Sequence, residues 1–115
     1  MKIIEKIRET LYRYRGYRYE NINYENAQII LKNNKQVVLL DVRSPQEYRE
    51  GHLPNAINIP LYDIKQKIEK IIPNKEETLI IYCQTGNRSK SAAGICYQKG
   101  YTNIYNITGG LDEII

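Results

Sequence analysis

The chain has 115 residues, with 17 lysines and arginines against 13 aspartates and glutamates, one histidine and two cysteines. This length allows one hydrophobic core but not two, and 42% hydrophobic with 26% charged residues is typical of a globular domain rather than a disordered chain. The longest apolar runs, such as VVLL at 37–40, are far shorter than the ~18 residues of a membrane-spanning helix.

The N-terminal segment differs from the rest of the chain. Residues 1–20 hold six basic and three acidic side chains and so carry three of the four net positive charges. Apolar residues recur at helical spacing over 3–14, which predicts an amphipathic helix, and the interspersed charges leave no apolar core for a secretory signal. We therefore expect a basic, Tyr-rich helical extension over 1–18, a domain over 19–115, and a cytoplasmic protein with reduced thiols and no membrane contact.

The stretch YRYRGYRY, residues 12–19, interleaves arginine with tyrosine. Proteins that bind single-stranded nucleic acid combine these residue types. A helix whose tyrosines cover the domain while its arginines stay in water explains the same pattern. We favour the helix and do not expect nucleic-acid binding, while docking of an acidic protein partner stays open.

Predicted strands and helices alternate from here on. Residues 17–23 form a connector or a short strand, and Asn23 is a plausible N-cap for a helix over 24–32. Further strands are expected over 37–42, 56–59, 78–83 and 103–107, and further helices over 44–51 (Ser44 as cap, Pro45 at the first position), 61–72, 89–100 and after the TGG turn.

The predicted strands are short continuous apolar runs, typical of strands buried on both faces. Together with the alternation of elements, this indicates the α/β class, with a parallel sheet between layers of helices. Ligand sites in such sheets lie beyond the carboxyl ends of the strands. Asp41 and Cys83 both lie at such ends.

The loop CQTGNRS, residues 83–89, leads from a strand end to a helix that begins near Arg88 or Ser89. Free backbone N–H groups of the first helical turn and the helix dipole favour an anion there. Gly86 lets the chain curl into a concave nest of N–H groups, and Arg88 adds a forked cation. These features together would lower the pKa of Cys83 and hold an anionic sulfur atom.

A buried, inert core cysteine followed by a polar turn is the alternative for Cys83. The convergence of thiol, glycine and arginine at one strand–loop–helix junction favours a reactive thiolate instead. A metal site lacks ligands, because His52 is the only histidine, Cys96 is 13 residues away and no Cys-x-x-Cys occurs. We expect no metal and no cofactor.

Two stretches resemble the single-domain rhodanese-like sulfurtransferases. They are LLDVRSPQEYREGHLPNAINIP (39–60) and IIYCQTGNRSKSAAGICYQKGY (80–101), and the closing NITGGLDEI (106–114) agrees more weakly. The resemblance implies a three-layer α/β/α sandwich with a five-stranded parallel sheet. It also implies that Cys83 carries transferred sulfur as a persulfide.

The chemistry that the resemblance implies begins when the Cys83 thiolate takes the sulfane sulfur of a small donor, thiosulfate or a persulfide. The backbone N–H groups of residues 84–88 would cradle the product, so that the expected substrate-binding residues are Gln84, Thr85, Gly86, Asn87, Arg88 and Ser89. Cyanide, a thiol or a partner protein would then accept the sulfur. The other function class is a binding or regulatory module of the same fold without significant turnover.

Loop length distinguishes a sulfur-transfer site from a phosphatase site. Phosphatases of similar fold place five residues between the cysteine and the arginine, whereas four lie between Cys83 and Arg88. The shorter ring suits a single sulfur atom rather than a tetrahedral phosphate, which favours sulfur transfer.

Four other residues have chemistry to offer, and for each we favour a structural role. Asp41 could be an active-site carboxylate, but a structural pair with Arg43 or loop-capping hydrogen bonds fit better. His52 could be a base, but it lies in a turn where a hydrogen bond to nearby backbone is expected. Cys96 shares a helix face with small residues and is expected to be a core thiol rather than a resolving one.

Overall fold

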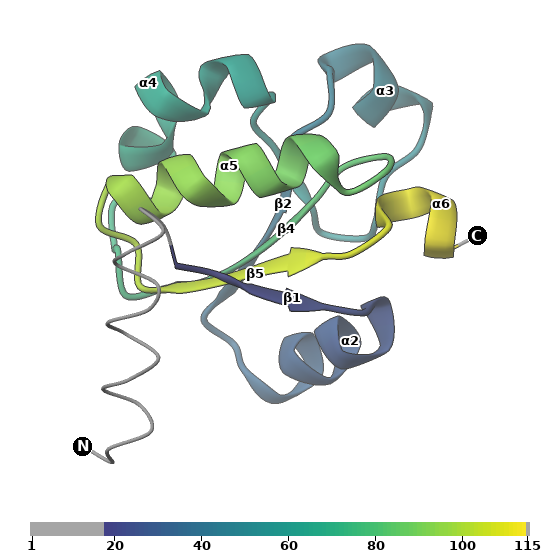
Figure 1. The fold of residues 1–115 in the computed structure, drawn as a ribbon, viewed down its shortest axis with the longest axis horizontal. Coiled ribbons are helices and arrows are strands. Elements are labelled where there is room, and N and C mark those ends of the chain that lie inside the picture. Colours follow the sequence, from purple (N-terminus) through teal and green to yellow (C-terminus); the bar gives the residue numbers. More distant parts are fainter. Residues whose placement is uncertain (1–17, 115) are drawn as a thin grey trace.

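The computed structural model describes residues 18–114, which form a five-stranded, wholly parallel sheet with helices on both faces (Figure 1). The helix predicted over 3–14 and, apart from Arg18, the extension over 1–18 lie outside these residues. The strands, in spatial order, are β1 (Glu20–Ile22), β5 (Asn103–Ile107), β4 (Thr78–Tyr82), β2 (Val37–Asp41) and β3 (Ile57–Asn58). The helices are α2 (Tyr24–Asn33), α3 (Pro45–Glu50), α4 (Leu61–Ile71), α5 (Asn87–Gln98) and α6 (Gly110–Ile114).

The sheet is the middle of three layers, as predicted. In Figure 1, α4 and α5 cover one face and α2 the other, while α3 and α6 lie towards the end at which the β5 arrow points. Two buried clusters correspond to the two faces. Leu79 and Ile81 of β4 belong to the cluster with α4 and α5, and Ile80 and Tyr82 belong to the opposite one. Successive residues of a strand point to opposite faces, so a continuous apolar run is what a sheet covered on both sides requires.

The edges of the sheet depart from the sequence predictions. The open stretch 17–23 contains strand β1, which pairs with β5. A buried strand over 56–59 is only partly right: β3 has two residues, and Ile57 is 41% exposed because, within residues 18–114, β3 pairs on one side only, with β2. Along α4 and its C-cap, Ile64, Ile68 and Ile72 are buried at a spacing of four residues, whereas Ile71 is 45% exposed. No helix among residues 18–114 is long and apolar enough to cross a membrane.

Helix α3 begins with the capping signal seen in the sequence. The Ser44 hydroxyl accepts a hydrogen bond from Glu47 N at 3.2 Å, and Glu47 Oε1 accepts one from Ser44 N at 3.1 Å. Pro45 occupies the first helical position, where a missing N–H costs no hydrogen bond. This reciprocal pair fixes the start of α3 at the carboxyl end of β2.

Helix α6 braces the chain segment that follows β4. The N–H groups of Leu111 and Asp112 donate to the carbonyl oxygens of Cys83 and Gln84, both at 3.0 Å. Gly110 has a φ of +58°, and a Cβ there would overlap the Cys83 carbonyl oxygen and the Gln84 carbonyl group. A side chain at position 110 is therefore excluded by backbone atoms that cannot turn away.

We expect Gly110→Ala to lower the free energy of unfolding by about 3 kcal/mol, since it combines left-handed backbone strain with overlap against main chain. Denaturant unfolding measures this effect. Gly100→Ala is the matched control, because Gly100 has a φ of +99° but its Cβ would meet only the flexible Lys75 side chain, at 3.4 Å. Equal losses in the two variants would show that the approach of α6 to the loop is unimportant for stability.

The face of α5 that packs on the sheet consists of its buried residues Ser89, Ala92, Ala93 and Cys96. Cys96 has no exposed surface, and burial raises the pKa of its thiol to about 12. It lies in the same core cluster as Leu79 and Ile104. The thiol therefore stays protonated at neutral pH, which confirms the prediction of a buried core cysteine.

Cys96→Ser should destabilise the fold by about 1–3 kcal/mol, because a hydroxyl replaces a thiol in an apolar site. Thermal unfolding checks this expectation. A melting temperature equal to that of the wild type would mean that the hydroxyl finds a partner at this position.

Candidate active site

Cys83 directly follows β4, the central strand of the sheet, at its carboxyl end. Helix α5 then begins at Asn87, two residues before the predicted start at 89, with Gly86 as its N-cap. Gly86 has a φ of +98°, a left-handed conformation that lets the chain turn directly into the helix. The connecting loop is therefore only Gln84–Gly86, and Asn87, Arg88 and Ser89 form the first helical turn.

The loop curls around the sulfur atom of Cys83. Cys83 Sγ accepts hydrogen bonds from Gly86 N at 3.0 Å and from Ser89 N at 3.4 Å, and the thiol lies 3.4 Å from Ser89 Oγ, to which it can donate. The Ser89 hydroxyl itself donates to the Gly86 carbonyl oxygen at 3.1 Å. Residues 83, 86 and 89 are all buried. Ser89 N lies beyond the 84–88 range expected to supply donors, because α5 starts early enough to bring its third residue over the sulfur.

The hydrogen bonds to Sγ lower the pKa of Cys83. Burial alone would raise it, because burial disfavours the thiolate. The Ser89 hydroxyl, which can rotate to donate to a thiolate, and the backbone N–H groups of Ser89, Gly86 and Thr85 stabilise the thiolate and outweigh burial. The largest contributions to the lowered pKa of Cys83 are therefore hydrogen bonds from the loop and the first helical turn.

Arg88 lies in the first turn of α5, but its guanidinium binds a carboxylate of α3. Arg88 Nη1 donates to Glu47 Oε1 at 2.7 Å, and Nη2 donates to Oε2 at 2.9 Å. These hydrogen bonds from Arg88 lower the pKa of Glu47 to about 2, against a smaller opposing effect of burial. The forked cation that the sequence predicts for the loop is present, and a neighbouring helix holds it.

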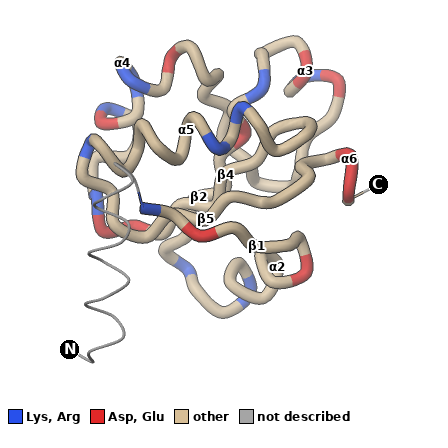
Figure 2. Tube along the Cα trace, in the orientation of Figure 1, with Lys and Arg blue, Asp and Glu red and all other residues tan. Residues whose placement is uncertain are grey.

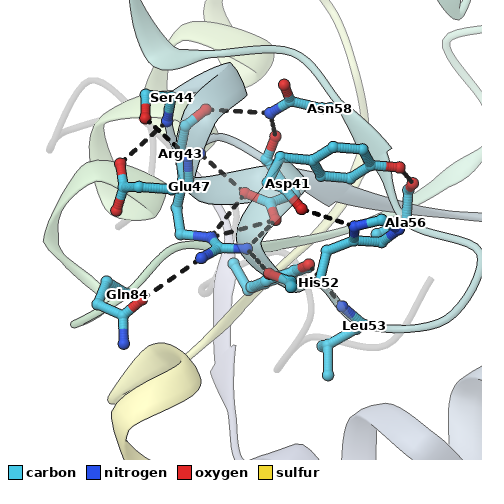
Figure 3. Close-up of polar contacts among 12 residues, drawn as sticks. Asp41, Arg43, Ser44, Glu47, His52, Leu53, Ala56, Asn58 and Gln84 are labelled. Carbon is cyan, nitrogen blue, oxygen red and sulfur yellow. Dashed lines mark hydrogen bonds and ion pairs between the residues drawn. The ribbon is translucent and has the colours of Figure 1, made fainter.

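The other expected substrate-binding residues take different positions. Gln84 is half-buried; its Nε2 donates to Asp112 Oδ1 at 2.6 Å, and its Oε1 is 3.5 Å from Arg43 Nη1 (Figure 3). Thr85 and Asn87 are exposed. Gln84 thus ties the loop to α6 on one side and to Arg43 on the other.

Asp41 and Arg43 form the structural pair that the sequence favours. Arg43 Nη2 donates to Asp41 Oδ2 at 2.8 Å and to the Gly51 carbonyl oxygen at 2.6 Å, and both side chains are almost fully buried (Figure 3). The Arg43 backbone N–H also donates to Asp41 Oδ1, at 2.9 Å. The pair holds the chain after β2 against the turn that follows α3.

The Nδ1 atom of His52 lies 2.8 Å from the Tyr48 carbonyl oxygen. The imidazole ring also stacks on the Tyr48 ring, with centroids 3.7 Å apart. The expected hydrogen bond to backbone is therefore present. It fixes the imidazole at the end of α3.

A pocket of about 600 Å³ lies beside the loop, between residues of α3 and α6. Charged, polar and apolar residues line it: Arg43, Glu47, Glu50, Gly51, His52, Leu53, Gln84, Leu111 and Ile114. Gln84, which follows Cys83 directly, forms part of the wall of this pocket. The described residues contain no group of three or more His, Cys, Asp or Glu side chains arranged to hold a metal ion.

The sequence did not reveal the role of Glu47 at the site. The Ser44-x-x-Glu47 pattern is a recognisable capping box, so a local role for Glu47 was visible. Its second partner, Arg88, is 41 residues away in the chain, and only the fold brings the two together. The brace from Leu111 and Asp112 was also missed, because it consists of backbone N–H groups that carry no sequence signal.

Comparison with known proteins agrees with this geometry. The family model of the rhodanese-like domain matches residues 25–115. The thiosulfate sulfurtransferase PspE of Escherichia coli K12 is 41% identical over 75 residues, covering 65% of this chain and 71% of PspE. A sulfurtransferase of Allochromatium vinosum is 33% identical over 81 residues, covering 70% of this chain and 74% of that protein.

Solved structures share the fold. An E. coli rhodanese with bound anions has a TM-score of 0.62 at 38% identity, covering 67% of this chain and 89% of the other. The human single-domain sulfurtransferase TSTD1 has a TM-score of 0.73 at 26% identity, covering 84% and 96%. With its parallel sheet, its cysteine loop at the end of β4 and these relatives, the chain belongs to the rhodanese-like sulfurtransferase family, as a single rhodanese-like domain.

Proposed function

We propose that the protein moves sulfane sulfur from a small donor such as thiosulfate to a thiophilic acceptor through a persulfide on Cys83. The observation that carries this proposal is the ring of donors around Cys83 Sγ, formed by Gly86 N and Ser89 N. The activity in the name of PspE, at 41% identity, supports thiosulfate as a donor.

In the first step the Cys83 thiolate attacks the terminal sulfur of thiosulfate. A bond forms between Sγ and that sulfur, the sulfur–sulfur bond of thiosulfate breaks, and sulfite leaves with the bonding electron pair. The enzyme is left as Cys83–S–S⁻, whose charge is stabilised by the N–H groups of the loop. No oxidant or reductant is consumed.

In the second step a nucleophile attacks the outer sulfur of the persulfide. Cyanide becomes thiocyanate, and a thiolate becomes a persulfide of its own, while the Cys83 thiolate is released as the leaving group. The covalent intermediate divides one transfer into two steps and predicts ping-pong kinetics. A thiol or a cysteine of a partner protein is the acceptor that we propose outside the laboratory.

Loop size and burial both favour sulfur as the transferred group. Cys83 has no exposed surface, so a donor has to present a protruding single atom, and the loop has to give way around it. The three-residue loop between Cys83 and α5 closes on one sulfur atom at 3.0–3.4 Å. A tetrahedral phosphate group needs a wider ring.

Replacing Cys83 by serine should abolish sulfur transfer and leave the fold intact, since an alcohol cannot form the persulfide and the change in volume is small. Thiosulfate:cyanide turnover and the intact mass after incubation with thiosulfate measure this. The wild type should gain one sulfur atom and Cys83→Ser none. A binding module without turnover would show neither gain nor turnover in the wild type, and turnover by Cys83→Ser would contradict the mechanism.

Ser89→Ala should raise the pKa of Cys83 more than Arg88→Ala does, because Ser89 contacts the sulfur whereas the charge of Arg88 is offset by Glu47. The pH dependence of alkylation by the uncharged reagent iodoacetamide reports this pKa. The Cys96→Ser background removes the second thiol from the measurement. A larger shift in Arg88→Ala would show that the cation, and not the hydroxyl, activates the cysteine.

A further inference from the structure

Two guanidinium groups lie beside the cysteine loop, and each is paired with its own carboxylate. Arg43 binds Asp41, and Arg88 binds Glu47 through two hydrogen bonds of 2.7 and 2.9 Å. Among the remaining charged residues of the adjoining pocket, Glu50 has no ion-pair partner within residues 18–114. Figure 2 shows further acidic positions on α6, close to the same end of the sheet. Both guanidinium groups that border the cysteine loop are thus already paired with carboxylates.

The two arginines differ in what an incoming anion could recruit. The Arg43 side chain is 5% exposed and is held by Asp41 and the Gly51 carbonyl oxygen, so it has a structural task. The Arg88 side chain is 39% exposed, its helical turn carries the donors to the sulfur, and the charge of Cys83 raises the pKa of Arg88, after the larger effect of Glu47. Arg88 is therefore the cation that an anionic donor would use, and Glu47 competes with the donor for its two terminal nitrogens.

Displacing Glu47 is unfavourable for a free anion. The capping box holds the carboxylate in place from Ser44, so its geometry is set before any donor arrives. Its fork-to-fork contact with Arg88 is the strongest geometry for this ion pair. A doubly charged donor gains little from Arg88 and is repelled by the Glu47 carboxylate beside it.

We propose that Glu47 determines donor specificity: by occupying Arg88 it disfavours the doubly charged thiosulfate and leaves the loop selective for sulfane donors of lower charge, such as organic persulfides. This inference rests on the sulfur transfer proposed above and narrows its donor class. Glu47 acts here through Arg88 and does not touch the reacting atoms.

Glu47→Gln tests the proposal cleanly. Glutamine serves at the third position of a capping box as glutamate does, so α3 keeps its N-terminal hydrogen bonds. The variant loses only the charge and one of the two hydrogen bonds that hold Arg88. The assays compare two donors of matched chemistry: thiosulfate, which carries two negative charges, and benzenethiosulfonate, which carries one. Each delivers a terminal sulfur to Cys83, and the leaving group is sulfite or benzenesulfinate. Cyanide is the acceptor in both assays.

We expect Glu47→Gln to lower the KM for thiosulfate about fivefold, the scale of one surface ion pair, and to change the KM for benzenethiosulfonate less than about twofold. Glu50→Gln is the control, because it removes the same charge from the same helix without releasing Arg88. It should shift the thiosulfate KM less than about twofold. In the double variant Glu47→Gln/Arg88→Ala, the decrease in the thiosulfate KM should vanish, because the Arg88 guanidinium that binds the donor is missing.

The outcomes separate the two proposals. If the wild type transfers sulfur from neither donor, the proposed function fails. If it transfers sulfur and Glu47→Gln leaves both KM values as they were, or if Glu50→Gln improves thiosulfate equally, the specificity role of Glu47 is wrong while sulfur transfer stands. A lower thiosulfate KM that persists in Glu47→Gln/Arg88→Ala also overturns the specificity role of Glu47.

Discussion

The site depends on the main-chain contact between α6 and the segment that follows β4. The N–H groups of Leu111 and Asp112 occupy the carbonyl oxygens of Cys83 and Gln84, which leaves the N–H groups of the loop facing the sulfur. Gly110 allows this approach because it has no Cβ. An anion-binding loop needs its peptide groups oriented in one direction, and here a helix more than twenty residues further along the chain provides the constraint.

The charged side chains around the loop mainly hold neighbouring chain segments in position. Asp41 and Arg43 anchor the chain after β2, and Glu47 joins the start of α3 to the start of α5 through Arg88. Asp41 partly offsets Arg43 and Glu47 partly offsets Arg88, so hydrogen bonds from the loop and helix contribute most to stabilising the thiolate. Such dipoles act at short range and suit a small, singly charged sulfur group.

Much of the fold could be predicted from local patterns. Continuous apolar runs indicated strands covered on both faces, and Ser44 with Pro45 marked the start of α3. The position of Cys83, at a strand end directly before a glycine-containing loop and a helix, was also predicted. The start of α5 was missed by two residues because its N-cap, Gly86, has no side chain to signal it. The edge strand β3 was predicted too long, since its second neighbour is absent and two residues suffice for its pairing with β2.

What a single sequence cannot give is the pairing of distant side chains. Glu47 and Arg88 each carry a local signal, a capping box and a loop cation, and neither signal names the other residue. Because of this contact, Arg88 is already engaged in an ion pair and is not a free cation for a substrate.

The opposite orientations of Tyr82 and Cys83 make the register of β4 critical. Cys83 joins the cluster under α4 and α5, while the Tyr82 ring joins the opposite one, where its hydroxyl accepts a hydrogen bond from Leu53 N at 3.0 Å. Leu53 forms part of the wall of the pocket beside the loop. One strand end therefore positions both the sulfur atom of Cys83 and a wall of the neighbouring pocket, on opposite faces of the sheet. Insertion of one residue into β4 would exchange the two faces and place a phenol where the thiol belongs, so the length of this strand is under a chemical constraint as well as a packing one.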